Sequence, residues 1–86
     1  MSREEILEGI KEILKTVNSI DKDKIDGITE STDFITDLSA PSTELINIIA
    51  KAENKFDVEF DDDDIDDMGS TVGETIDLVV KALAAQ

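Results

Sequence analysis

Ser42 is the residue whose type and position could best carry chemistry. It follows Pro41, and Pro is favoured at the first position of a helix, so we expect a helix to begin here. A hydroxyl in the first turn points toward solvent, beside backbone N–H groups that lack helical partners. Because these groups and the helix dipole favour an anion, a phosphodiester on Ser42 would be well placed. On position alone, a helix cap is the commoner role of such a serine.

The sequence offers few residues for nucleophilic catalysis or for metal binding. The chain contains no Cys and no His, which removes thiol nucleophiles, the Ser-His-Asp triad and the usual zinc ligands. We therefore expect no enzyme. Six of the seven residues in Asp61–Asp67 are Asp, but no register here offers the glycine and glutamate that an EF-hand loop needs. We expect no dedicated metal site, and a weak divalent-ion site stays open.

Charge narrows the possible partners. The 86-residue chain has 22 acidic and 8 basic residues, a net charge of −14. Such a surface repels nucleic acids and anionic membranes and attracts a partner with a basic patch. The plainer interpretation is that the acids only keep a small domain soluble. The first residues mix acids with apolar side chains, so we expect neither a signal peptide nor a membrane span, and we predict a cytoplasmic protein.

Apolar periodicity predicts three longer helices and one short helix. The longer helices are expected over 3–17, 41–55 and 72–84, and the short one over 63–68. Ser2 with Glu5, and Thr71 with Glu74, form capping boxes before the first and last of them. With Pro41 as the first helical residue, Ser39 or Ala40 would cap the second longer helix.

The connection over 18–40 is longer than usual, which suggests a loop that packs onto the helices. Its expected anchors are apolar: Ile20, Ile25, Ile28, Phe34, Ile35 and Leu38. A short helical turn near Thr32–Asp37 is also expected. The predicted fold is all-α: a small antiparallel four-helix bundle with a long packed loop between its first two helices, as a single domain over residues 1–86.

The segment around Ser42 resembles the acyl carrier protein family. Family members typically read Asp-Leu-Gly-Ala-Asp-Ser-Leu where residues 37–43 read Asp-Leu-Ser-Ala-Pro-Ser-Thr. Both continue into an aliphatic helix that ends in a Phe and an acid, here Phe56 and Asp57. The likeness covers nearly the whole chain in length and order. Pro41 and Thr43 depart from the family signature, which points to a specialised carrier with dedicated partners.

The resemblance implies a function. Ser42 falls where the family serine carries 4′-phosphopantetheine, which a transferase takes from coenzyme A; Ser39 and Thr43 are fallback sites. The arm would hold acyl groups as thioesters for a specialised fatty-acid, lipid or polyketide pathway. The partners would be that transferase and acyl-loading and acyl-processing enzymes with basic docking patches. The candidate docking residues on this chain, which we expect to be a monomer, are Asp37, Glu44, Ile46 and Glu53.

A hydrophobic shelter for the acyl chain is also implied. Its candidate lining residues are Phe34, Leu45, Ile46, Ile49 and Ile65, although ordinary core packing explains all but Ile46. Ile46 lies about 100° from the apolar face of its helix, so we expect it to be exposed or at a pocket rim. The competing hypothesis is an unmodified acidic interaction domain with a carrier-like fold.

Overall fold

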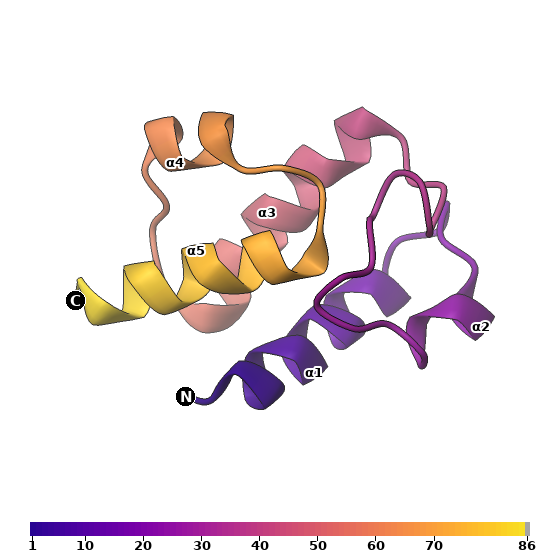
Figure 1. Cartoon of the computed structure of the whole chain (residues 1–86), viewed down its shortest axis with the longest axis horizontal. Coiled ribbons are helices and arrows are strands. Elements are labelled where there is room, and N and C mark those ends of the chain that lie inside the picture. The colour runs from indigo at the N-terminus through magenta and orange to yellow at the C-terminus, as the bar shows by residue number, and fades with distance from the viewer. Residues whose placement is uncertain (86) are drawn as a thin grey trace.

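The computed structural model describes residues 1–85, which form five helices and no strand. The helices are α1 (Arg3–Lys15), α2 (Lys22–Ile25), α3 (Ser42–Phe56), α4 (Asp62–Asp67) and α5 (Val72–Ala84). The three long helices α1, α3 and α5 pack against one another, and α4 and the loop with α2 lie at the periphery (Figure 1). The predicted all-α bundle is confirmed, with the single turn of α2 as an additional element.

Local capping signals locate most helix ends. Ser2 Oγ accepts the Glu5 N–H at 3.2 Å, and the Glu5 carboxylate accepts the Ser2 N–H at 3.0 Å, so the predicted capping box forms. α5 has its predicted bounds, whereas α1 ends at Lys15 rather than Val17. The cap predicted for α3 is wrong. Pro41 itself is the N-cap, because its ψ of 150° is extended and the helical backbone begins only at Ser42.

Two contacts show that α1 and α3 run antiparallel. Lys55 pairs with Glu12 across 2.7 Å, and Lys51 reaches Thr16 at 3.0 Å, so residue numbers rise along one helix as they fall along the other. Gly9 permits the close approach between them, since a Cβ there would lie 2.6 Å from the Phe56 ring. The aliphatic stripes of the long helices meet in a continuous core that contains Ile6, Ile10, Leu14, Ile48, Ile76 and Val79.

The long loop packs onto the bundle, as predicted. Its buried anchors are Ile20, Ile25, Ile28, Phe34 and Leu38, whereas Ile35 is 37% exposed and is not an anchor. The helix expected near Thr32–Asp37 is a single closed turn, in which the Asp33 carbonyl accepts the N–H groups of Asp37 and Leu38. The turn does not continue as a helix because Ser39, which follows it, has a left-handed backbone with φ of 58°. At the start of the turn, the Phe34 N–H donates to the Ser70 carbonyl at 2.8 Å.

Candidate attachment site at the start of α3

Ser42 is the first residue of α3 and its side chain is exposed. Pro41 has no side chain that could cap the helix, and no hydrogen bond to the Ser42 hydroxyl occurs within residues 1–85. The hydroxyl is therefore not held inward and can be reached from solvent. The first N–H groups of a helix have no partner in a preceding turn. Here the Glu44 N–H donates to the Pro41 carbonyl at 2.9 Å, so an anion attached at Ser42 would rely on the N–H groups of Ser42 and Thr43.

A rigid approach fixes the position of Ser42. Phe34, Leu38 and Ala40 are almost fully buried, and the Ala40 N–H donates to the Phe34 carbonyl at 2.9 Å. Between these anchors, Ser39 adopts a left-handed backbone with φ of 58°. The chain therefore reverses tightly just before Pro41 and presents the first turn of α3 outward.

Two hydrogen-bonded carboxylates, one in this loop and one in α5, hold the segment 69–71 that precedes α5. Asp33 accepts the Thr36 N–H at 3.0 Å and the Ser70 hydroxyl at 2.7 Å, which lower the pKa of its carboxyl. Glu74 accepts the Thr71 hydroxyl at 2.8 Å and the Gly69 N–H, and these bonds lower its pKa in the same way. Both groups therefore favour the ionised form.

Sequence reasoning missed the role of Asp33. At Glu74 it predicted a capping box with Thr71, and only one half of that box forms. The carboxylate accepts the Gly69 N–H and the Thr71 hydroxyl, and not the Thr71 N–H that a capping box requires. Asp33 carried one local signal, since an Asp that begins a turn often binds the N–H groups just after it. Its bond to Ser70 joins residues 37 positions apart, and no local pattern indicates it.

The candidate docking residues do not share one face. At 100° per residue, Ile46 and Glu53 lie within about 40° of Ser42 around α3, whereas Glu44 lies about 200° away. Ile46 is 67% exposed, as predicted. The structure thus brings Ile46 and Glu53 onto the Ser42 flank of α3 and places Glu44 on the opposite flank.

Two of the candidate docking carboxylates bind backbone groups of this chain. Glu53 is half-buried and accepts the Phe60 N–H at 2.9 Å, so it holds the segment that follows α3. Asp37 is exposed and accepts the Asp33 N–H at 2.8 Å within the loop. Each carboxylate therefore stabilises this chain's own fold, and this role alone is enough to explain why an acid is found at the position.

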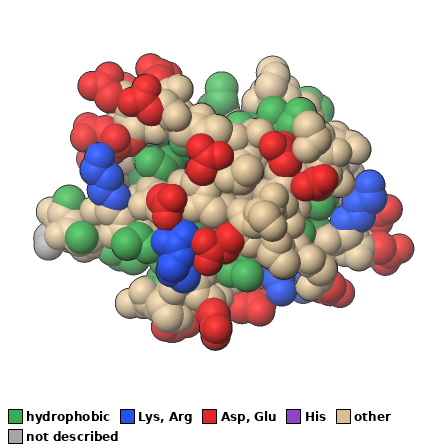
Figure 2. Space-filling model, in the orientation of Figure 1, with side chains coloured by type: hydrophobic (Ala, Val, Ile, Leu, Met, Phe, Trp, Pro, Cys, Tyr) green, Lys and Arg blue, Asp and Glu red, His purple; other side chains and the backbone are tan. Residues whose placement is uncertain are grey.

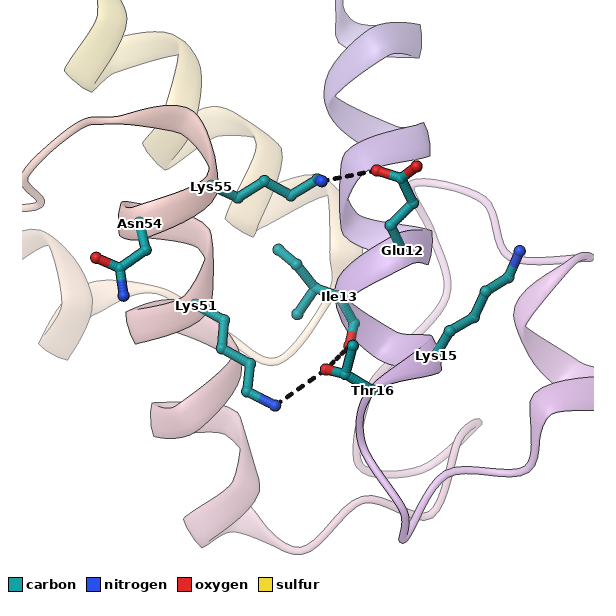
Figure 3. Close-up of a pocket in the computed structure, with 7 residues that line it drawn as sticks. All are labelled: Glu12, Ile13, Lys15, Thr16, Lys51, Asn54 and Lys55. Atoms are coloured by element: carbon teal, nitrogen blue, oxygen red, sulfur yellow. Dashed lines mark hydrogen bonds and ion pairs between the residues drawn. The ribbon is translucent and has the colours of Figure 1, made fainter.

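The candidate acyl-pocket residues are mostly packed core. Phe34 and Ile49 are buried, Leu45 and Ile65 are partly buried against the same core, and Ile46 lies outside on the surface. The surface hollows between α1 and α3 (Figure 3) and around residues 57–61 are lined by other side chains.

The acidic run lies over and beside α4, where red side chains gather in Figure 2. Within residues 1–85, no three acidic side chains converge closely enough to hold a metal ion. Asp64 instead pairs with Lys81 of α5 at 2.9 Å. None of the described helices has the length and apolar character needed to cross a bilayer.

Comparison with known proteins adds independent information. Residues 6–79 match the family described as "PP-binding: Phosphopantetheine attachment site". The chain is 37% identical over 79 residues to an acyl carrier protein of Lactobacillus acidophilus, covering 92% of this chain and 94% of that one. It is 34% identical over 82 residues to an acyl carrier protein of Thermotoga maritima, covering 95% and 96%. Its fold is similar to the thermally stable acyl carrier protein from Enterococcus faecalis, with a TM-score of 0.68, 28% identity, and coverage of 95% and 99%.

Proposed function

Because this chain belongs to the acyl carrier protein family and carries 4′-phosphopantetheine as a covalent group, we propose that Ser42 bears the arm. One observation carries the proposal: an exposed hydroxyl with no partner within residues 1–85 opens α3, at the end of a loop pinned by Phe34, Leu38 and Ala40. Ser39 and Thr43 are also exposed. Of the three, only Ser42 falls where the family serine stands.

The start of α3 fits a phosphodiester. The unpaired N–H groups of a first helical turn and the helix dipole stabilise negative charge. When attached, the arm supplies a terminal thiol that holds acyl groups as thioesters. The chain itself contributes an attachment point, a docking surface and a packed interior, and partner enzymes perform the catalysis. The protein is therefore a carrier and no enzyme.

We assign docking of partner enzymes to the Ser42 flank of α3. Ile46 offers exposed apolar surface there, and Glu53 adds a carboxylate that can face a basic patch. Asp37 contributes from the loop before α3, whereas Glu44 lies on the opposite flank of the helix and would not meet the same partner surface. Single exposed ion pairs are worth about 0–1 kcal/mol. Docking is consequently weak and short-lived, which suits a carrier that visits several enzymes.

Pro41 and Thr43 favour a specialised pathway, because the transferase and the synthases meet the chain at these positions. We expect dedicated partners rather than the general fatty-acid enzymes. The acyl chain would shelter beside Phe34, Leu45, Ile49 and Ile65, with Ile46 at the rim. A cytoplasmic monomer remains our prediction.

Mass measurement tests the attachment site. The protein is incubated with coenzyme A and a broad-specificity phosphopantetheinyl transferase, and its intact mass is recorded. We expect one phosphopantetheine increment that is absent from Ser42→Ala and present in Ser39→Ala and Thr43→Ala. Circular dichroism checks that each variant is folded.

Two outcomes would contradict the proposal. An increment that persists in Ser42→Ala places the arm elsewhere. If none of several transferases adds a phosphopantetheine increment, the alternative is favoured, namely an unmodified acidic interaction domain. The departures from the family signature at Pro41 and Thr43 are the reason for testing this alternative.

A further inference from the structure

The carboxylate of Asp33, in the loop that precedes Ser42, has different partners on its two oxygens. Oδ1 accepts the N–H groups of Ile35 and Thr36 at 2.8 Å and 3.0 Å, so it closes a turn of the loop itself. Oδ2 accepts the hydroxyl of Ser70, from the segment before α5, at 2.7 Å. A single side chain thus shapes the loop and joins it to a distant part of the chain.

The backbone of Asp33 closes the same turn. Its carbonyl accepts the N–H groups of Asp37 and Leu38 at 3.0 Å and 3.2 Å, and its N–H donates to the Asp37 carboxylate at 2.8 Å. Leu38 is only 3% exposed, so the far end of the turn is fixed in the core. Residues 39–41 alone separate this turn from Ser42, so the turn sets where the chain enters α3.

The bonds of Asp33 persist at neutral pH. The Thr36 N–H, followed by the Ser70 hydroxyl, lowers the pKa of the Asp33 carboxyl, so the group is ionised and accepts hydrogen bonds. Beside it, the Phe34 N–H donates to the Ser70 carbonyl at 2.8 Å. Ser70 therefore holds two consecutive residues of the loop, through its hydroxyl and its carbonyl. Loss of the Asp33 carboxylate would free both the turn and the Ser70 hydroxyl.

We propose that Asp33 is a positioning residue for the transfer of phosphopantetheine to Ser42, a role that rests on Ser42 as the attachment site. In this transfer the Ser42 oxygen bonds to the pantetheine-bearing phosphorus of coenzyme A, and the pyrophosphate P–O bond breaks. The adenosine bisphosphate half of coenzyme A leaves, and the transferase accepts the hydroxyl proton. Asp33 acts on none of these atoms directly and holds the loop that presents the hydroxyl.

The order of this loop matters because a transferase that reaches the Ser42 hydroxyl must also approach the residues just before it. With the turn already formed, the transferase does not have to order the loop on binding. Without the Asp33 carboxylate, that conformational cost falls on the encounter and weakens the binding of the carrier. The chemical step within the complex is the same. The role therefore predicts a change in KM and not in kcat.

Transferase kinetics test this role. Initial rates of transfer from coenzyme A are measured against carrier concentration with one transferase. We expect Asp33→Ala to raise KM for the carrier about five-fold or more and to leave kcat within about two-fold of the wild type. Ser70→Ala should raise KM by a smaller factor. The Asp33→Ala/Ser70→Ala variant should have the KM of Asp33→Ala, because the two residues share one bond.

Two further variants make the test specific. Asp33→Asn keeps an oxygen for the N–H groups of the turn, and its amide can donate to the Ser70 hydroxyl, so it should restore KM to near the wild type. Asp26→Ala removes the same charge from an exposed site of the same loop, where the carboxylate has no hydrogen bond within residues 1–85. It should keep the wild-type KM. Circular dichroism at the assay temperature checks that each variant is folded.

Amide exchange tests the order of the loop without a transferase. The N–H groups of Leu38 and Ala40 donate to carbonyls within the loop, so they report on its order. We expect both to exchange faster in Asp33→Ala than in the wild type. Ile10 and Leu14, in the core of α1, should change little.

Three outcomes would overturn this role alone. The first is a wild type modified at Ser42 while Asp33→Ala keeps the wild-type KM or loses only kcat. The second is unchanged exchange at Leu38 and Ala40, and the third is an equal rise of KM in Asp26→Ala. If the wild type is not modified at Ser42, the proposed attachment fails and this role fails with it.

Discussion

Ser39 adopts a backbone conformation that its side chain disfavours. Its φ of 58° lies in the left-handed region, where a Cβ crowds the following carbonyl at about 1–2 kcal/mol. Glycine occupies this position in the family signature and has no Cβ to crowd. The loop that presents Ser42 is therefore held in place by its buried neighbours despite local strain.

Replacing Ser39 with Gly should stabilise the fold. Relief of the strain exceeds the extra entropy that glycine gains in the unfolded chain, so we expect about 0.5–1 kcal/mol in the free energy of unfolding. Thermal melting should rise by about 3–6 °C. Ser19→Gly is the control, since Ser19 is exposed and its φ is not positive. A melting temperature for Ser39→Gly at or below that of the wild type would refute the strain argument.

At the scale of elements, the long loop depends on its contacts with the start of α5. The Val72 N–H donates to the Thr32 carbonyl and the Gly73 N–H to the Glu30 carbonyl, each at 2.8 Å. Glu74 closes the other side of this junction through its bonds to Gly69 and Thr71. Since Ser42 follows the same loop, the junction also fixes the attachment site.

The junction should be sensitive to acid. The pKa of the Glu74 carboxyl is lowered from 4.5 by the Thr71 hydroxyl and the Gly69 N–H. The carboxylate thus stabilises the fold above about pH 4.5, and this contribution is lost as the pH falls through the lowered pKa. We expect Glu74→Gln to lose about 1 kcal/mol at pH 7 and to approach the wild type near pH 3 in urea denaturation. Glu59 is exposed, so Glu59→Gln should have the stability of the wild type at both pH 7 and pH 3. If Glu59→Gln lost stability at pH 7 as Glu74→Gln does, the hydrogen bonds of Glu74 would not explain the loss.

Helix ends were predictable where a local signal marks them, and so was the packing of the loop, but the hydrogen bonds of the loop were not. α5 begins after its Thr71 cap, and α1 begins after its Ser2 cap. The turn at Asp33 depends on bonds to Ser70, just before α5, that no spacing reveals. The single turn of α2 has an Asp21 cap but too few residues for a periodic pattern. Ser42 was found from its family-like neighbours.

For the whole molecule, the excess of acids is a source of self-repulsion. Acidic side chains crowd the surface around α4, and four of the described bases (Arg3, Lys11, Lys55 and Lys81) pair with carboxylates. The net charge of −14 already counts all 8 bases, so the whole of it stays unbalanced. Repulsion of this kind destabilises a compact state and is screened by salt.

Raising NaCl from 0.01 to 0.5 M should therefore raise the melting temperature by about 5 °C. Changing the exposed Asp62, Asp63, Asp66 and Asp67 to Asn should reduce this dependence, because these residues contribute repulsion without an ion pair of their own. Magnesium chloride should stabilise the wild type at lower concentrations than NaCl. A melting temperature that does not change with either salt would count against the repulsion.

α4 differs from the long helices in containing no buried residue. Only Ile65 and the adjoining Met68 pack against the core from this segment, and one ion pair, Asp64 with Lys81, joins it to α5. Local unfolding of α4 would expose little apolar area, so its amide protons should exchange for deuterium well before those of α1, α3 and α5. The wall of the bundle beside Ile65 should consequently open at a lower free energy than the walls formed by α1, α3 and α5.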